Sequence, residues 1–516
     1  MLLGGFAALV AFVADYKLKL GMVPGVILAS GIFGVGAFAL VKLRGAPREM
    51  GITFGLKFFS VTAYKILNFT VSMWLIKDLG FDSEQAGGII VGWGVFMAAA
   101  TVVSGSLTDA LGLRRTLFAG VTLCVLTRVV MVFAENRWVA LGCGLLPLAV
   151  GEALCTPVLV AALRLYSKPS QRTVAFSLFY GLMNFGFMFG YFISDAVMGG
   201  YVPGGGWWRP GSGYGMLILA SMGIDLLMIP LVWFLKPGVQ MTESGFERLA
   251  GYGHEYPPGM GTAAKLGLAV RNAFSDTMGA LGRLFASKGF GKLLVFLLVI
   301  GLLKIVFNVM DYVLSPFAER EIGAAAVSKV GRLNSTNSIL ILVLAPLAGM
   351  LTRKFSSYRM VVAGGFITAL SFVFMCLPAA VFEGAAGGWL GKAVGNGYLG
   401  IVGEVHPYFV MIFLWQVVFS VGEACYSPRV YEYAASIAPP GQEASYSSLS
   451  YIPLLIGKIT TGLAFSGLLD RYCPAEGPRN PGMLWTWIGL LVLAAPVGLL
   501  VFRRSIQVRE EGRDDG

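Results

Sequence analysis

Residues 151–157 read GEALCTP, and residues 422–428 read GEACYSP. Both stretches have the form Gly-Glu-Ala-x-x-(Ser/Thr)-Pro, and the second begins 271 positions after the first (422 − 151). Each lies within a long apolar run, where an ionisable side chain costs at least about 2.5 kcal/mol. The pattern indicates a chain of two related halves, each of which carries a glutamate at membrane depth.

The same offset relates further positions that follow the two stretches. Internal repeats of this kind, with a binding site at their interface, are typical of secondary transporters. The matching pairs are Pro169 and Pro440, Gln171 and Gln442, Leu178 and Leu449, Tyr180 and Tyr451, and Gly186 and Gly457.

The composition predicts an all-α polytopic membrane protein. Hydrophobic residues make up 56% of the 516 positions and charged residues only 13%, whereas soluble proteins carry about 25% charged residues. Apolar runs of roughly 20 residues are long enough for a helix to cross a bilayer. We expect about fourteen spans, at 2–16, 21–41, 52–76, 86–108, 114–134, 138–164, 173–198, 214–235, 291–317, 333–352, 359–381, 406–432, 444–469 and 483–502.

The longest interruption between spans, rich in charge, glycine and proline, predicts how the chain is divided. Apolar residues at helical spacing within it predict an amphipathic helix on the membrane surface, the alternative being an ordinary solvated linker. A second, Gly-rich insertion is expected at about 383–405 on the outer side. The five predicted regions are a two-helix extension at 1–50, a six-helix bundle at 51–235, the linker at 236–290, a second six-helix bundle at 291–502 and a tail at 503–516.

The net charge of +11 reflects basic residues in short alternate loops, as the positive-inside rule expects. We therefore expect no nucleic-acid partner, and we place both termini in the cytoplasm, with the chain in the cell (inner) membrane. Residues 2–14 lack a preceding basic region and a cleavage site, so no cleaved signal peptide is expected. The six cysteines and two histidines lack ligand spacing, so neither a metal site nor another cofactor is expected.

The loop between two predicted spans reads GSLTDALGLRR (105–115). It resembles the cytoplasmic loop signature of the major facilitator superfamily, and the resemblance covers about 51–502. The glycines allow tight turns, and the aspartate is placed to interact with a helix N-terminus or a basic partner. The resemblance implies two six-helix bundles and a conformational role for Gly105, Asp109, Gly112, Arg114 and Arg115.

Within that superfamily the chain resembles, remotely, the proton-coupled oligopeptide transporters. The stretches that carry the resemblance are GEACYSP followed by IAPPG (437–441), LNSTNSILILVLAPLAG (333–349), FSLFYGLMNFG (176–186) and MDYVLSPFAER (310–320). Two positions depart from that family: its acidic E-x-x-E-R motif on the first core helix is replaced by a segment with Lys65, and its lysine on the fourth aligns near Thr156. A difference in substrate would arise here.

Ionisable residues within the spans are the candidate site residues. The bases are Lys65, Arg128, Lys304 and Lys458, and the acids are Glu152, Asp225, Asp311 and Glu423. Equal numbers predict pairing, because an unpaired buried ion is strongly disfavoured. We expect a structural pair of Arg128 and Asp225.

The resemblance places core helices 1, 4, 7 and 10 around a central cavity. Helical spacing puts Lys304, Asn308 and Asp311 on one face, and Glu152 and Thr156 on another. A carboxylate in a desolvated cavity can hold a proton near neutral pH, and a movable contact with a lysine could switch its proton affinity. The alternative is purely structural ion pairs. The residues expected to bind substrate or protons are Lys65, Glu152, Thr156, Lys304, Asn308, Asp311, Glu423, Tyr426 and Lys458.

We therefore expect a secondary transporter rather than an enzyme. The sequence shows no nucleophile–histidine pair, metal cluster or phosphate loop that would support catalysis. The expected activity is proton symport of a small polar or zwitterionic organic solute by alternating access, and a peptide-like solute is one such candidate. A facilitator, a proton-driven exporter and a transporter-like sensor remain the alternatives.

Overall fold

The structure, a computed structural model, places most of the chain in long helices. Two predicted spans, 2–16 and 21–41, lie outside the described residues, as does most of the predicted amphipathic helix in 236–290. The described residues are 44–168, 171–200, 212–248, 290–352, 355–436 and 452–506, with isolated positions between 261 and 279.

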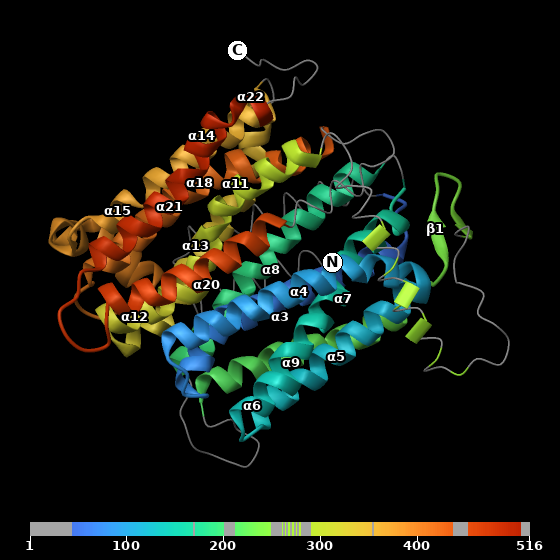
Figure 1. The fold of residues 1–516 in the computed structure, drawn as a ribbon, viewed down its shortest axis with the longest axis horizontal. Coiled ribbons are helices and arrows are strands. Elements are labelled where there is room, and N and C mark those ends of the chain that lie inside the picture. Colours follow the sequence, from blue (N-terminus) through green and yellow to red (C-terminus); the bar gives the residue numbers. More distant parts are fainter. Residues whose placement is uncertain are drawn as a thin grey trace.

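The first half of the described chain contains six membrane-length helical segments, and Figure 1 shows their arrangement. One of them is continuous through three labelled pieces, α6, η1 and α7. The segments are α3 (Arg48–Lys77), α4 (Ser83–Leu111), α5 (Leu113–Phe133), α6 (Arg137–Val139) with η1 (Ala140–Leu145) and α7 (Leu146–Tyr166), α8 (Arg172–Gly200) and α9 (Gly213–Trp233).

The second half repeats this arrangement, and three of its segments are also built from consecutive pieces. The segments are α11 (Phe290–Asn308) with η3 (Val309–Val313) and α12 (Leu314–Glu321), α13 (Ala324–Leu351), α14 (Ser357–Ser371) with α15 (Val373–Cys376), α18 (Pro407–Ser436), α20 (Ile452–Tyr472), and α21 (Pro481–Val501) with the short α22 (Arg503–Ile506).

These twelve segments coincide with the last twelve predicted spans, and the all-α polytopic fold class is confirmed. Eight described helical segments are long and apolar enough to cross a membrane by length and composition. A helix satisfies its backbone hydrogen bonds internally, which is why apolar runs in a bilayer adopt it. The full count of about fourteen stays a prediction, because residues 1–43 are not described.

Short connections fold the segments back on one another. The turn before α4 is closed by a capping box, in which Asp82 accepts a hydrogen bond from the Gln85 amide at 2.7 Å and Gln85 accepts one from the Asp82 amide at 3.4 Å. Between α4 and α5 the chain reverses through the single residue Gly112, whose φ of +88° favours glycine. This explains the glycine of the 105–115 loop.

The glycines of the two repeated stretches let neighbouring helices cross closely. A Cβ atom added to Gly151 on α7 would lie 2.7 Å from the Sγ atom of Cys124 on α5. In the second half, a Cβ atom on Gly364 of α14 would lie 2.6 Å from the Gly422 carbonyl oxygen on α18. The repeat therefore preserves a tight helix crossing in each half.

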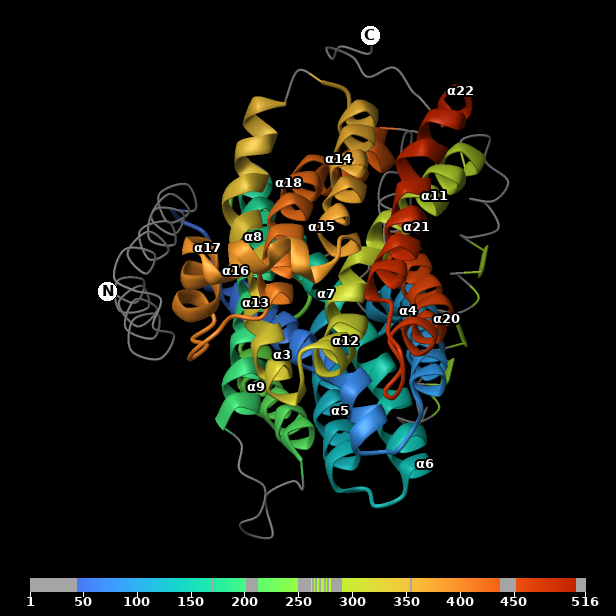
Figure 2. The same ribbon diagram turned by 90° about the vertical axis from the view of Figure 1, so that its left-hand side faces the viewer.

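The two halves lie side by side in Figures 1 and 2, the first coloured blue to green and the second yellow to red. Across the interface α4 packs against α20, α8 against α13, and α3 against η3. The interface therefore uses helices from both bundles, and it brings α3 and η3 to the centre of the molecule.

Two connecting segments have structure of their own. The linker begins with a hairpin of β1 (Val239–Met241) and β2 (Phe246–Arg248), paired antiparallel, which the sequence reasoning did not predict. The expected outer insertion consists of short helices that pack on α18. These are η4 (Ala379–Phe382), α16 (Glu383–Gly387), α17 (Trp389–Gly391) and η5 (Lys392–Tyr398).

Candidate functional site

A buried ion pair joins the two halves. The Nζ atom of Lys65 on α3 lies 2.8 Å from each carboxylate oxygen of Asp311 on η3. The hydroxyl of Tyr191 on α8 donates a third hydrogen bond to Asp311 at 2.8 Å. Lys65 also lies over the rings of Phe187 and Tyr191, 4.9 and 4.8 Å from their centroids. Both charged side chains are less than a tenth exposed, so separating the halves here breaks a desolvated contact.

The π-helical turn η3 sets the direction of the Asp311 side chain. A π turn inserts an extra residue into an α-helix and is frequent at functional sites. The sequence predicted one shared face for Lys304, Asn308 and Asp311, but Asp311 contacts α3 whereas Lys304 donates a hydrogen bond to Ser427 on α18 at 3.0 Å. Asn308 is buried. The irregular turn therefore directs two charges of one segment toward different partners.

Glu423 on α18 is held by a neutral amide. The Nδ2 atom of Asn337 on α13 donates to its Oε2 atom at 2.7 Å and lies 3.1 Å from the Ser420 hydroxyl oxygen. Lys304 lies over the rings of Phe307 and Tyr426, at 4.8 and 5.1 Å from their centroids. Among the ion pairs formed by described residues, none joins Lys304 to Glu423. The arrangement leaves a carboxyl and an ammonium group near one another without a direct contact.

Glu152 has a different environment from its repeat partner. It accepts a hydrogen bond from Arg128 on α5 at 2.8 Å, and Arg128 also forms the expected pair with Asp225 on α9, at 2.6 Å. The pairing of Arg128 with Asp225 is thus confirmed, whereas the participation of Glu152 was not foreseen. Thr156 follows one turn later on α7 and is half-buried.

The structure describes the remaining predicted site residues only in part. Lys458 lies on α20, and Gly105 and Asp109 lie on α4, but their side chains are outside the described part of the chain. Arg114 stacks over the Trp233 ring at 4.6 Å from the centroid, and Arg115 is exposed.

Further contacts between the halves cluster at one membrane end of the molecule, here called the Lys77 end because α3 finishes there. Lys77 and Glu319 on α12 form an ion pair at 2.8 Å. The buried Asp195 on α8 pairs with Arg332 on α13 at 2.9 Å. In the described residues, every ion pair between the halves is one of these two or the central Lys65–Asp311 pair.

Several residues that contact the site or join the halves were not predicted from the sequence. Asp195 lies near the end of α8, and Arg332 lies just outside the predicted span 333–352, where loop residues also carry charge. Asn337 and Tyr191 have no charge to mark them. A polar side chain within an apolar helix could have marked these residues. Its partner can be identified only when the neighbouring helices are known.

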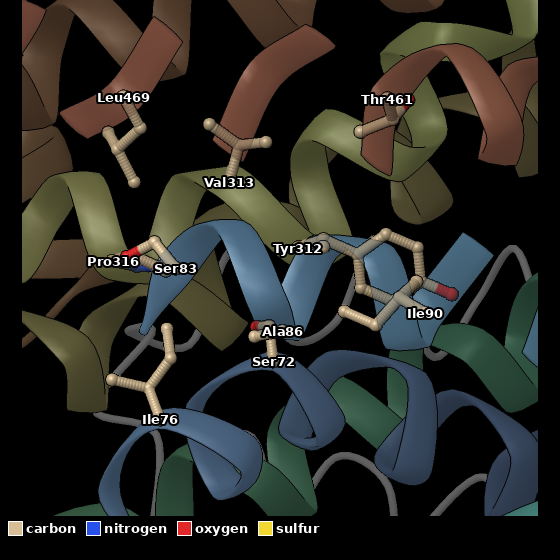
Figure 3. Close-up of a pocket in the computed structure, with 11 residues that line it drawn as sticks. Ser72, Ile76, Ser83, Ala86, Ile90, Tyr312, Val313, Pro316, Thr461 and Leu469 are labelled. Atoms are coloured by element: carbon tan, nitrogen blue, oxygen red, sulfur yellow. The ribbon is translucent and has the colours of Figure 1, made fainter. Parts of the chain in front are cut away.

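A narrow pocket lies between the halves, and its lining includes Ile76, next to Lys77, and Tyr312, next to Asp311. Figure 3 shows the side chains around it. The pocket leaves about 30 Å³ for the centres of water molecules, so it is narrow. Figure 3 shows Tyr312 beside it, and the Tyr312 hydroxyl donates to the Asn68 Oδ1 atom at 2.5 Å. The lining is mainly apolar and comes from both halves: Ser72, Ile76, Ser83, Ala86, Gly87, Ile90, Tyr312, Val313, Pro316, Thr461 and Leu469.

Comparisons with known proteins agree with this architecture. The model of the Major Facilitator Superfamily matches residues 53–403. No curated protein sequence matches the chain.

Solved structures of transporters share the fold at low sequence identity. The chain is similar to a POT family transporter in complex with 5-aminolevulinic acid, with a TM-score of 0.64 and 15% identity over 90% of this chain and 98% of that one. It is similar to a peptide transporter POT in complex with sulfate, with a TM-score of 0.62 and 17% identity over 90% and 97% of the two chains. A POT family transporter in complex with a thioalcohol conjugated peptide gives a TM-score of 0.63 and 15% identity over 90% and 98%.

Proposed function

The chain belongs to the major facilitator superfamily, whose members are membrane transporters rather than enzymes, and from that premise we propose that it carries a small polar or zwitterionic organic solute by alternating access, driven by proton symport. The two halves would separate first at one membrane end and then at the other, around a site at their interface. The residues proposed to form that site are Lys65, Lys304, Asn308, Asp311, Glu423 and Tyr426, together with Glu152, Thr156 and Lys458.

The observation that carries the proposal is the buried Lys65–Asp311 pair between the halves. Alternating access separates these two groups and exposes each of them to the cavity, where a group of opposite charge on a solute can replace the lost partner. A zwitterionic solute offers a carboxylate to one and an ammonium to the other. The substrate class therefore follows from the charges that the halves expose when they part.

Proton coupling is supported by Glu423. Its carboxylate is buried and accepts a hydrogen bond from the neutral amide of Asn337. A carboxyl group in such surroundings can exist with or without its proton, and Lys304 on the facing segment can stabilise the deprotonated form when the two approach. A change in their separation would then release or bind a proton.

The basic loops support an orientation. They lie at the membrane end opposite to Lys77, and the positive-inside rule favours the cytoplasm for that end. The Lys77 end would then face outward, where the ion pairs Lys77–Glu319 and Asp195–Arg332 join the halves. We place the protein in the cell (inner) membrane, with both termini in the cytoplasm, and retain the predicted division at 1–50, 51–235, 236–290, 291–502 and 503–516.

The similar solved structures support the choice of solute. One of those transporters holds 5-aminolevulinic acid, which is a small zwitterion, and another holds a conjugated peptide. The presence of Lys65 on the first core helix, where the peptide-transporter motif is acidic, favours a solute that differs from ordinary peptides.

The test is uptake into proteoliposomes with an imposed pH gradient, acidic outside, screened across amino acids, short peptides, sugars and charged drugs. Accumulation of a zwitterion above equilibrium, abolished by a protonophore, is the expected result. Uptake that equilibrates equally with and without the gradient would indicate a facilitator. Transport only against the proton flux would indicate an exporter, and either result would overturn symport.

A further inference from the structure

One guanidinium group in the first half is shared by two carboxylates. Arg128 on α5 is fully buried, and its Nη2 atom lies 2.8 Å from the Oε1 atom of Glu152 on α7. Its Nη1 atom lies 2.6 Å from the Oδ2 atom of Asp225 on α9. Both acids are also buried. The three residues, here called the Arg128 cluster, come from three different helices of the same half.

The charges of the Arg128 cluster do not balance. Arginine keeps its proton in proteins, so one positive charge faces two carboxylates. The other groups that hold the guanidinium are neutral: its Nε atom donates to the Ser221 hydroxyl at 2.9 Å, and its Nη1 atom lies 3.3 Å from the Cys124 carbonyl oxygen. With both acids ionised, the cluster would hold a net negative charge away from water.

Among the described residues, Arg128 is the one base that forms an ion pair with Glu152 or Asp225. The charged groups that act on Asp225 are Arg128 and Glu152. The titratable neighbours are the thiols of Cys124 and Cys155, which lie against each other between α5 and α7, and Tyr64 on α3. None of these groups is a cation.

We propose that the Arg128 cluster is a proton-binding site, in which Glu152 and Asp225 share one proton taken up from solvent. Two carboxylates that compete for one buried cation cannot both remain ionised at low cost, so one of them binds a proton and the cluster becomes neutral. The site is separate from Glu423, which lies in the other half. Its occupancy follows from charge balance and does not depend on which solute is carried.

A chain of polar side chains lies between the cluster and the interface of the halves. Tyr64 lies within electrostatic range of Glu152 and is hydrogen-bonded to Asn68. Asn68 in turn accepts the hydrogen bond from Tyr312, the residue next to Asp311. Separation of the halves would break this chain at Tyr312, and exchange of the proton at that step rests on the proposed transport function.

Infrared difference spectroscopy of the purified, lipid-reconstituted protein at about pH 7 tests the site directly. A protonated carboxyl group has a C=O stretching band that an ionised carboxylate lacks and that shifts in D₂O. The difference spectrum of wild type minus Glu152→Gln is expected to show one such band, and so is that of wild type minus Asp225→Asn. Both variants are expected to lose it, because removing either acid leaves a balanced pair with Arg128.

Asp195→Asn is the matched control, because Asp195 is buried and paired one-to-one with Arg332. It is expected to leave the band unchanged. Retention of the band in both cluster variants, or loss in only one of them, would overturn a shared proton. Because the measurement needs no transport, a failure here is distinguishable from a failure of the proposed symport. Two independent variants keep the test decisive if one does not fold.

Discussion

The Asp311→Asn substitution tests whether the central ion pair holds the halves together at the Lys77 end. Asp311 receives Lys65 at 2.8 Å on both oxygens and the Tyr191 hydroxyl at 2.8 Å. Asparagine has nearly the same shape but no charge. The buried Lys65 ammonium would keep its two aromatic neighbours and lose its counter-ion.

The magnitude follows from the cost of an uncompensated buried charge. Breaking a buried pair by removing one partner costs about 3–5 kcal/mol. The two rings beside Lys65 remain and supply about 0.5–2 kcal/mol each, so the lower end, about 3 kcal/mol, applies. This cost falls on the state with the halves closed around Lys65, because separation allows water to reach the ammonium. The equilibrium should shift toward the state open at the Lys77 end by roughly 10²-fold.

Spin-label distance measurement in lipid nanodiscs reports this shift. Labels at Glu84→Cys and Ala325→Cys, both exposed positions on opposite halves, are introduced with the exposed Cys143 replaced by serine. The Asp311→Asn protein is expected to gain a long-distance population that the parent lacks.

The matched control is the double variant Lys65→Met/Asp311→Leu, which replaces the pair by apolar side chains and should remain close to the parent. Identical distance distributions for the parent and Asp311→Asn would show that the pair does not hold this state. A double variant displaced as far as the single one would show that lost packing, not the unpaired charge, is responsible.

Three further changes test other parts of the molecule. Glu423→Gln keeps the hydrogen bond from Asn337 but cannot release a proton, so accumulation driven by a pH gradient should be lost in proteoliposomes. The control Glu404→Gln, in an exposed loop, should accumulate solute as the parent does. Equal accumulation in the two variants would remove Glu423 from coupling. Gly422→Ala places a methyl group against the Gly364 carbonyl and Thr368, and it should lower the free energy of unfolding by about 1–3 kcal/mol. The control Gly92→Ala has nothing within 4 Å of the added Cβ and should not lower it. Thermal melting compares the two variants. Burial lowers the pKa of His406, and the Nδ1 atom of His406 accepts a hydrogen bond from the Tyr408 amide. The neutral imidazole therefore contributes to stability above its ordinary pKa of about 6.5, and this contribution is lost as the pH falls. A melting temperature that falls as steeply with acid in His406→Gln as in the parent would contradict this.

The sequence predicted the helices well because their signal is local. The run 52–76 became α3 (Arg48–Lys77), and the run 406–432 became α18 (Pro407–Ser436). In a bilayer each backbone polar group needs an internal partner, so length and hydropathy alone determine a helix. The hairpin at Val239–Met241 was missed because the linker residues have no comparable signal.

The candidate site was predicted in part. The sequence identified Lys65, Asp311 and Glu423 as charges within spans, and the structure pairs the first two across the interface. It did not identify Asn337 as the partner of Glu423, since an amide within an apolar helix is uncharged and unremarkable in composition. It also could not anticipate the π turn at η3, which changes where Asp311 points relative to Lys304.

The repeated stretches GEALCTP and GEACYSP separate what the local sequence pattern predicts from what depends on tertiary packing. A glutamate at membrane depth, preceded by a glycine, could be predicted in each half from the chain alone, because membrane burial and helix crossing depend on residues close together in the chain. The partners could not: Glu152 shares Arg128 with Asp225, whereas Glu423 is held by Asn337. A buried side chain finds its partner on whichever helix packs beside it, and that neighbour is set by the rotation and packing of distant segments.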